Sequence, residues 1–195
     1  MRKIIMLCAA MLCFAGAAAA QNNTTATLAA EPAPAAASKT SSGSDYPWQV
    51  GTNFTYQRFD IGGSNSNLYG IDTSVNRWLG DSMFGIEGNV SATFGRQSPT
   101  NRQQTVFYGG GIHVGSRSGK FKPWAHFDVG GAHQRFNQHI GPATLNGFGL
   151  LGGGGVDIQW RSHIAWRVQA DYFGTRFNGL WQKSVSVGGG ILFDF

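Results

Sequence analysis

Charged and imidazole side chains interrupt several short apolar segments of this chain. Glu87 lies in GIEGN, His126 and Asp128 in AHFDV, Asp157 in VDIQW and Arg167 in WRVQA. An arginine removed from water is costly unless carboxylates pair with it, so we expect Glu87 and Asp157 to hold Arg167. A histidine with a carboxylate two residues away could instead be an oriented base, as in a catalytic triad, but no serine is evidently directed at His126. An internal ion pair is therefore the expectation.

These side chains belong to segments in which apolar and polar residues alternate with a period of two, the pattern of a β-strand with two different faces. In FGIEGNVSATF, for example, one face carries Phe84, Ile86 and Val90, and the other carries Glu87 and Asn89. Eight such segments follow residue 46, at 48–59, 68–76, 84–94, 105–115, 123–131, 148–160, 164–172 and 184–195. The alternation predicts an all-β chain of eight strands.

The two faces differ in a way that distinguishes a membrane barrel from a soluble one. The uncharged face carries Trp, Tyr and Phe mostly near strand ends, with Val, Ile, Ala and Gly between them, as aromatic girdles at two interfaces would require. The other face carries a few charges among Gly, Ser and Thr, which suit a crowded closed interior. Its charged residues are Asp72, Glu87, Asp128, Asp157, Arg167 and Asp171. We expect an eight-stranded antiparallel transmembrane up-and-down β-barrel; a soluble or periplasmic barrel, with its charges facing water, is the alternative.

The connections between the eight segments differ in length. Short connectors are expected near 77–78, 117–120 and 161–162. Longer ones, richer in Gly, Asn and Pro, are expected across 62–67, 96–103, 134–145 and 175–182. Alternating short and long connections are typical of bacterial outer-membrane barrels, whose short turns lie in the periplasm. The sequence thus predicts a protein of the cell outer membrane with both termini in the periplasm.

The first residues have the composition of an export signal. Arg2 and Lys3 precede a short apolar run that ends in three alanines, so residues 1–20 are expected to be a cleaved signal peptide. Residues 21–46 are rich in Ala, Pro, Ser and Thr, which predicts a disordered leader before a barrel at 47–195. Both cysteines lie within the signal. The remaining 13 basic and 10 acidic residues give too weak an excess to indicate nucleic-acid binding.

The chain ends in GGGILFDF, a strand pattern that continues to the last residue. Ile191, Phe193 and Phe195 are expected to share the outward face. The last strand must pair with the first, because an unpaired edge cannot lie in hydrocarbon. This end resembles the terminal signal that the outer-membrane assembly machinery recognises in bacterial barrel proteins.

Three segments carry a family resemblance: GIDTSVNRWLGDSMFGIEGNVSATF, GGGVDIQWRSHIAWRVQADYFGTRF and GGGILFDF. With them, residues 46–195 resemble the OmpA-like (opacity-type) eight-stranded outer-membrane β-barrel family. The resemblance implies fold and location more than activity, because members of the family serve different ends. In such barrels an internal Arg–Glu bridge plugs the lumen, and a change of partner is thought to open a small channel. The corresponding candidates here are Arg167, Glu87, Asp157, Asp128 and His126. No interior lysine is expected as an alternative partner.

These observations predict a structural protein that serves membrane integrity and surface contact, with at most a narrow gated pore. Because interior acids outnumber interior arginine, such a pore would prefer cations. The simplest interpretation is that the charges only fill and rigidify the barrel. A lipid A-modifying enzyme and a surface adhesin are the alternative functions. We expect a protein that is not an enzyme and has no cofactor and no metal.

The expected partners are outer-membrane lipid, lipopolysaccharide and the barrel assembly machinery, and the protein is expected to be a monomer. Several arginines lie in or beside the predicted outer loops, where lipopolysaccharide phosphates would attract guanidinium groups. These candidates are Arg96, Arg102, Arg135 and Arg176. Simple solvation of the loops is the other interpretation.

Overall fold

The computed structural model describes residues 46–61, 64–98, 101–138, 141–177 and 179–195. Within them the chain forms β1 (Trp48–Ile61), β2 (Ser64–Trp78), β3 (Phe84–Ser98), β4 (Asn101–Gly115), β5 (Phe121–Gln138), β6 (Gly141–Arg161), β7 (Ile164–Phe177) and β8 (Leu180–Asp194). The predicted signal peptide 1–20 and the predicted leader 21–46, apart from Tyr46, lie outside the described residues. The described part of the chain has no helix with the length and apolarity to cross a membrane.

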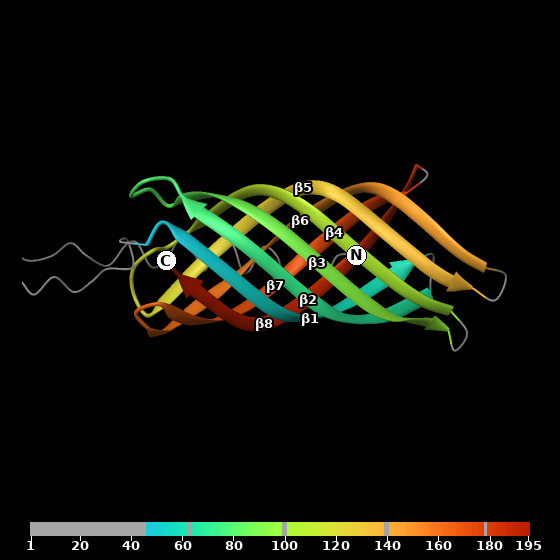
Figure 1. Ribbon diagram of the computed structural model, residues 1–195, viewed down its shortest axis with the longest axis horizontal. Helices are drawn as coiled ribbons and strands as arrows, with labels where there is room; N and C mark the ends of the chain where they lie inside the picture. The colour runs from blue at the N-terminus through green and yellow to red at the C-terminus, as the bar shows by residue number, and fades with distance from the viewer. Residues whose placement is uncertain (1–45, 62–63, 99–100, 139–140, 178) are drawn as a thin grey trace, which may run out of the picture. The chain divides into compact units, whose positions relative to one another are not determined.

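Each strand pairs antiparallel with its neighbours in sequence, and β1 also pairs with β8, so the sheet closes into a barrel (Figure 1). The closing ladder starts with Gln49 opposite Asp194. Beside it, the Phe195 N–H donates to the Trp48 carbonyl oxygen at 2.8 Å. The predicted up-and-down barrel of eight antiparallel strands is confirmed. Closure pairs both edges of every described strand, as a strand in hydrocarbon requires.

The period of two in the sequence is also the period of burial. Along β1 the exposed fraction of the side chain changes from 1% at Asn53 to 61% at Phe54. Polar and charged side chains are buried in the interior, whereas large apolar side chains such as Ile86, Ile112 and Val168 are exposed on the outer wall. A water-soluble protein would show the opposite preference. The polar interior and apolar outer wall are those expected of a barrel surrounded by lipid.

The long connectors predicted from the sequence are mostly strand, and this prediction was wrong. β5 continues to Gln138 and β6 begins at Gly141, although the composition of 134–145 predicts a loop. The same holds for the predicted connectors 62–67, 96–103 and 175–182. Strands that extend past the apolar band meet water on their outer face, so their polar composition does not mark the end of pairing. The short turns occur near the predicted places, at 79–83, 116–120 and 162–163.

The barrel interior is filled in layers along its axis. Toward the β7–β8 hairpin, apolar side chains form a cluster of Phe107, Ala132, Leu151, Phe173 and Phe177. A layer of charged and imidazole side chains comes next. Trp78 and Trp124 lie on its other side, with the His113 ring 5.1 Å from the centroid of each. The charged layer therefore lies between two layers of large apolar side chains.

Candidate functional site in the barrel interior

Four strands direct the candidate charged side chains into the interior. Glu87 comes from β3, His126 and Asp128 from β5, Asp157 from β6 and Arg167 from β7. His126 and Asp128 share the inner face of β5 because they are two residues apart. All five are buried, with between 0% and 7% of the residue surface exposed. The structure thus brings the candidate residues into one layer. It confirms the predicted Arg167–Asp157 pair but gives Glu87 other partners.

Arg167 is held by Asp157 through two parallel hydrogen bonds. The Arg167 Nε donates to Asp157 Oδ1 and Nη2 donates to Oδ2, both at 2.8 Å. Nη1 donates to Ser74 Oγ at 3.3 Å, and the guanidinium carbon lies 4.3 Å from the Trp124 ring centroid. Trp124 Nε1 also donates to Asp157 Oδ1 at 3.0 Å. This bidentate pair satisfies both charges and fixes the guanidinium plane.

Glu87 binds two histidines rather than Arg167, which corrects the predicted pairing. Its Oε2 lies 2.5 Å from His113 Nδ1, and its Oε1 lies 2.8 Å from His126 Nδ1. His113 and His126 are opposite each other in the ladder of β4 and β5, so both rings reach the carboxylate from neighbouring strands. The closest partners of Glu87 are therefore the imidazoles of the two neighbouring strands, β4 and β5.

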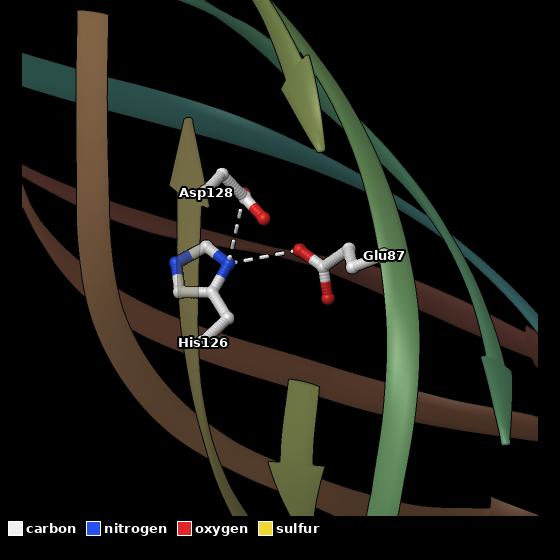
Figure 2. Close-up of side chains that lie close together, drawn as sticks. All are labelled: Glu87, His126 and Asp128. Atoms are coloured by element: carbon white, nitrogen blue, oxygen red, sulfur yellow. Dashed lines mark hydrogen bonds and ion pairs between the residues drawn. The ribbon is translucent and has the colours of Figure 1, made fainter. Parts of the chain in front are cut away.

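His126 contacts carboxylates through both ring nitrogens. Nδ1 faces Glu87 and also lies 3.4 Å from Asp128 Oδ2, while Nε2 lies 3.2 Å from Asp171 Oδ1. Figure 2 shows the ring nitrogen between the carboxylates of Glu87 and Asp128. A neutral imidazole has only one N–H, so donation from both nitrogens requires the imidazolium. No serine hydroxyl hydrogen-bonds to His126 in the part of the chain that the structure describes.

Asp128 has an unusual environment for a carboxylate. It is 0% exposed, yet within the described chain neither of its oxygens accepts a hydrogen bond. Buried carboxylates are normally hydrogen-bonded, and an exception calls for a specific cause. The 3.4 Å contact with His126 is its closest approach to a positive group.

Lys122 is an interior lysine that the sequence interpretation missed. It is 5% exposed, and its Nζ lies 3.9 Å from Asp194 Oδ2. Asp194 also accepts a hydrogen bond from Gln49 Nε2 at 2.7 Å. The signal was present, because Lys122 has the same parity as His126 and Asp128, but the predicted strand begins one residue too late, at Pro123. The expectation that the interior contains no lysine was wrong.

Basic side chains are exposed on the outer wall at one end of the barrel, where the β1–β2, β3–β4, β5–β6 and β7–β8 hairpins turn. They come from six strands. We name this set the basic belt; it comprises Arg58, Arg96, Arg102, Arg135, Arg176 and Lys183. The four arginines proposed from the sequence as lipopolysaccharide contacts belong to it, and they lie on strands rather than in loops. Among residues whose exposure is described, the exposed acid is Asp81, in the turn between β2 and β3.

Two of the belt residues are direct neighbours. Arg96 on β3 lies opposite Arg102 on β4 in the ladder, and like charges in that arrangement destabilise a sheet.

At the far end of the barrel, the C-terminal residues lie as the alternation predicts. Phe193 and Phe195 are 40% and 61% exposed on the outer wall, and Ile191 on the same face is partly buried.

The sequence matches no family model and no curated protein. Its structure is similar to solved barrels. Neisserial surface protein A aligns with a TM-score of 0.67 at 10% identity, covering 76% of this chain and 97% of that one. Ail, the attachment invasion locus protein of Yersinia pestis, aligns at 0.54 with 12% identity, covering 75% and 97%. The outer membrane protein OprG from Pseudomonas aeruginosa aligns at 0.54 with 11% identity, covering 77% and 96%.

The chain has the fold of an eight-stranded outer-membrane β-barrel. Such a barrel encloses an interior just wide enough for side chains to fill, as the layers of this protein do. At identities of 10–12%, the likeness concerns the fold alone. One fold can host different activities, and the function depends on the side chains that each chain places on it.

Proposed function

We propose that this protein is a structural barrel of the bacterial outer membrane whose outer wall binds lipopolysaccharide. In this proposal both termini lie in the periplasm and the basic belt lies at the outer leaflet. The outward aromatic residues at the end of β8 serve as the signal for the assembly machinery, and the barrel acts as a monomer. No nucleic acid and no catalytic step are involved.

The basic belt is the observation that carries this proposal. Guanidinium groups form short, bidentate hydrogen bonds with phosphates, and lipopolysaccharide presents phosphates at the outer leaflet. The exposed Arg96–Arg102 pair favours an anionic ligand in particular, because a phosphate between the two groups would turn a repulsion into two attractions. Loop solvation alone gives no reason to place two arginines opposite each other.

The packing of the interior supports a structural role rather than a pore. The cavity between the charged layer and the apolar cluster has a volume of about 20 Å³ and is lined by Asp72 and Asp171 on one side and Phe107 on another. That is room for about one water molecule. Ion flow would require both the apolar cluster and the Arg167–Asp157 pair to rearrange. A catalytic base at His126 is disfavoured as well, because both of its nitrogens face carboxylates.

Lipopolysaccharide should stabilise the folded barrel through the belt. Purified full-length protein in detergent would be heated to increasing temperatures with and without lipopolysaccharide. The samples would then be run on a gel without boiling, and the loss of the compact folded band with temperature would give the unfolding midpoint. We expect Arg96→Gln/Arg102→Gln to weaken binding at least about tenfold, because each lost charge-assisted bond is worth about 1.5–3 kcal/mol. The increase in midpoint should also shrink at high salt.

The matched control removes two exposed arginines from the opposite end of the barrel. Arg77→Gln/Arg161→Gln changes the net charge by the same amount, and these residues stack on Trp48 and Trp160 instead. It should respond to lipopolysaccharide like the unaltered protein. Equal stabilisation of both double variants by lipopolysaccharide would contradict the proposal.

A further inference from the structure

We propose that Glu87, His126 and Asp128 bind one divalent transition-metal ion inside the barrel. Their candidate ligand atoms, one from each side chain, all lie within 4.8 Å of one another, and Figure 2 shows the three side chains pointing toward a common point. Ligand atoms around a single ion, each about 2.1 Å from it, lie within about 4.2 Å of one another. Small side-chain rotations would therefore complete the coordination.

Asp128 provides an independent reason for a ligand at this place. Its carboxylate is completely buried and points into the cluster, and neither oxygen accepts a hydrogen bond in the described chain. Leaving a buried charged group unsatisfied is expensive. A cation between Asp128 and Glu87 would supply the missing partner at the site where the two carboxylates converge on His126 Nδ1.

The neighbours of the cluster hold the ligands as they are held in known metal sites. His126 Nε2 lies 3.2 Å from Asp171 Oδ1, which fixes the N–H on Nε2 and leaves Nδ1 for the metal. His113 Nδ1 contacts the second oxygen of Glu87 at 2.5 Å, which orients that carboxylate. A carboxylate that accepts the other N–H of a ligating histidine is a regular companion of metal sites.

The middle strand makes room for the ion. Glu87 on β3 and Asp128 on β5 are both ladder partners of Gly111 on β4. A Cβ at residue 111 would overlap the carbonyl oxygen of Phe127 and would also lie 2.7 Å from Asp128 Oδ1, closer than real contacts permit. Because Gly111 has no side chain, the carboxylates of Glu87 and Asp128 can approach each other over the backbone of β4.

The interior also has an excess of negative charge that a metal would reduce. Six buried carboxylates line it in the described residues, against one lysine and one arginine. Arg167 is used by Asp157 and Lys122 lies beside Asp194, so neither neutralises the cluster. One imidazole nitrogen and two carboxylates suit Zn²⁺, Fe²⁺, Co²⁺ or Mn²⁺, whereas Mg²⁺ and Ca²⁺ prefer sites made of oxygen alone.

Because the site is enclosed by apolar layers, the metal would enter while the barrel folds. Full-length protein would be refolded into detergent with Zn²⁺, treated with a chelator to remove loosely bound metal, and its zinc content measured per chain. We expect one equivalent in the unaltered protein and loss of the retained zinc in Asp128→Asn, because the substitution removes the charge of one of the three proposed ligands. Refolding with Co²⁺ should give a visible absorption band that Asp128→Asn lacks.

Asp72→Asn is the matched control, because it removes the same charge from the same lumen outside the cluster. Asp72 is 4% exposed and accepts a hydrogen bond from Gln169. The control should keep its equivalent of zinc, and equal loss from both variants would show a nonspecific effect of charge and overturn the proposal. A gel shift on heating would establish that each variant is folded. Folded unaltered protein that retains no zinc or cobalt would also overturn it, leaving a proton on His126 as the bridge between the carboxylates.

Discussion

Removal of the Arg167 guanidinium should destabilise the barrel strongly, whereas removal of both members of its ion pair should not. In Arg167→Met the apolar stem remains, but among the described residues Asp157 keeps only the Trp124 Nε1 donor, at 3.0 Å. In Asp157→Leu the guanidinium keeps Ser74 Oγ at 3.3 Å and the face of Trp124. Each single variant therefore leaves a buried charge without its counterion.

The expected magnitudes follow from the geometry of the pair. Breaking a buried ion pair by removing one partner costs about 3–5 kcal/mol, whereas replacing both partners with apolar residues of similar size is often close to neutral. With two bonds of 2.8 Å in the pair, each single variant should lose about 3–5 kcal/mol of unfolding free energy. The double variant Arg167→Met/Asp157→Leu should lose less than either single variant.

Urea unfolding of full-length protein in lipid vesicles, followed by tryptophan fluorescence, measures these free energies. Arg161→Met is the control, because that exposed arginine stacks on Trp160 at 5.2 Å and lies outside the buried ion pair. Its effect should stay within about 0.5 kcal/mol. A change in unfolding free energy of less than about 1 kcal/mol in Arg167→Met would contradict a role for the buried pair, and so would a double variant whose loss equals the sum of the two single losses.

Three further outcomes are expected. Planar-bilayer recordings of folded protein should show no channel current, and neither should those of Arg167→Ala, because the apolar cluster still closes the lumen. Cation-selective current steps in the variant alone would show that Arg167 keeps the pore closed. Gly153→Ala should lose about 1–3 kcal/mol, since a Cβ there would overlap Asp171 Oδ1, whereas Gly88→Ala, with nothing within 4 Å, should change little in the same urea assay. Phe195→Ala should lower the amount of barrel in the outer membrane of cells, measured by immunoblot, and leave the stability of refolded protein unchanged; normal amounts would count against an assembly signal.

The number of strands, their faces and the closure of the barrel are predictable from local sequence. Alternation fixes which side of a strand each residue occupies, so Asn53 and Phe54 could be assigned to the interior and the outer wall from parity alone. Strand ends are not fixed in this way. Where β5 and β6 leave the apolar band, their outer face becomes polar, and composition no longer distinguishes a paired strand from a loop.

The Arg167–Asp157 pair joins neighbouring strands and was predicted, whereas the partners of Glu87 depend on distances across the barrel, which no local pattern contains. Position along each strand places Glu87 and Arg167 at one level, but β3 and β7 are not neighbours, and the imidazoles of β4 and β5 reach Glu87 first. The missing hydrogen bonds of Asp128 are equally invisible in the sequence, because they are a property of what surrounds the side chain. For that reason a metal site was not expected.

The length of the β5–β6 hairpin has a consequence for any partner at that end of the barrel. β6 has 21 residues, which at about 3.3 Å each and a tilt of about 40° rises roughly 50 Å, about twice the height of an apolar band of ~25 Å. The projecting half is held by ladder hydrogen bonds from Gln134 opposite Leu145 to Gln138 opposite Gly141. A partner binding there therefore meets a surface whose backbone is already ordered, and the association loses little entropy compared with the capture of a flexible loop.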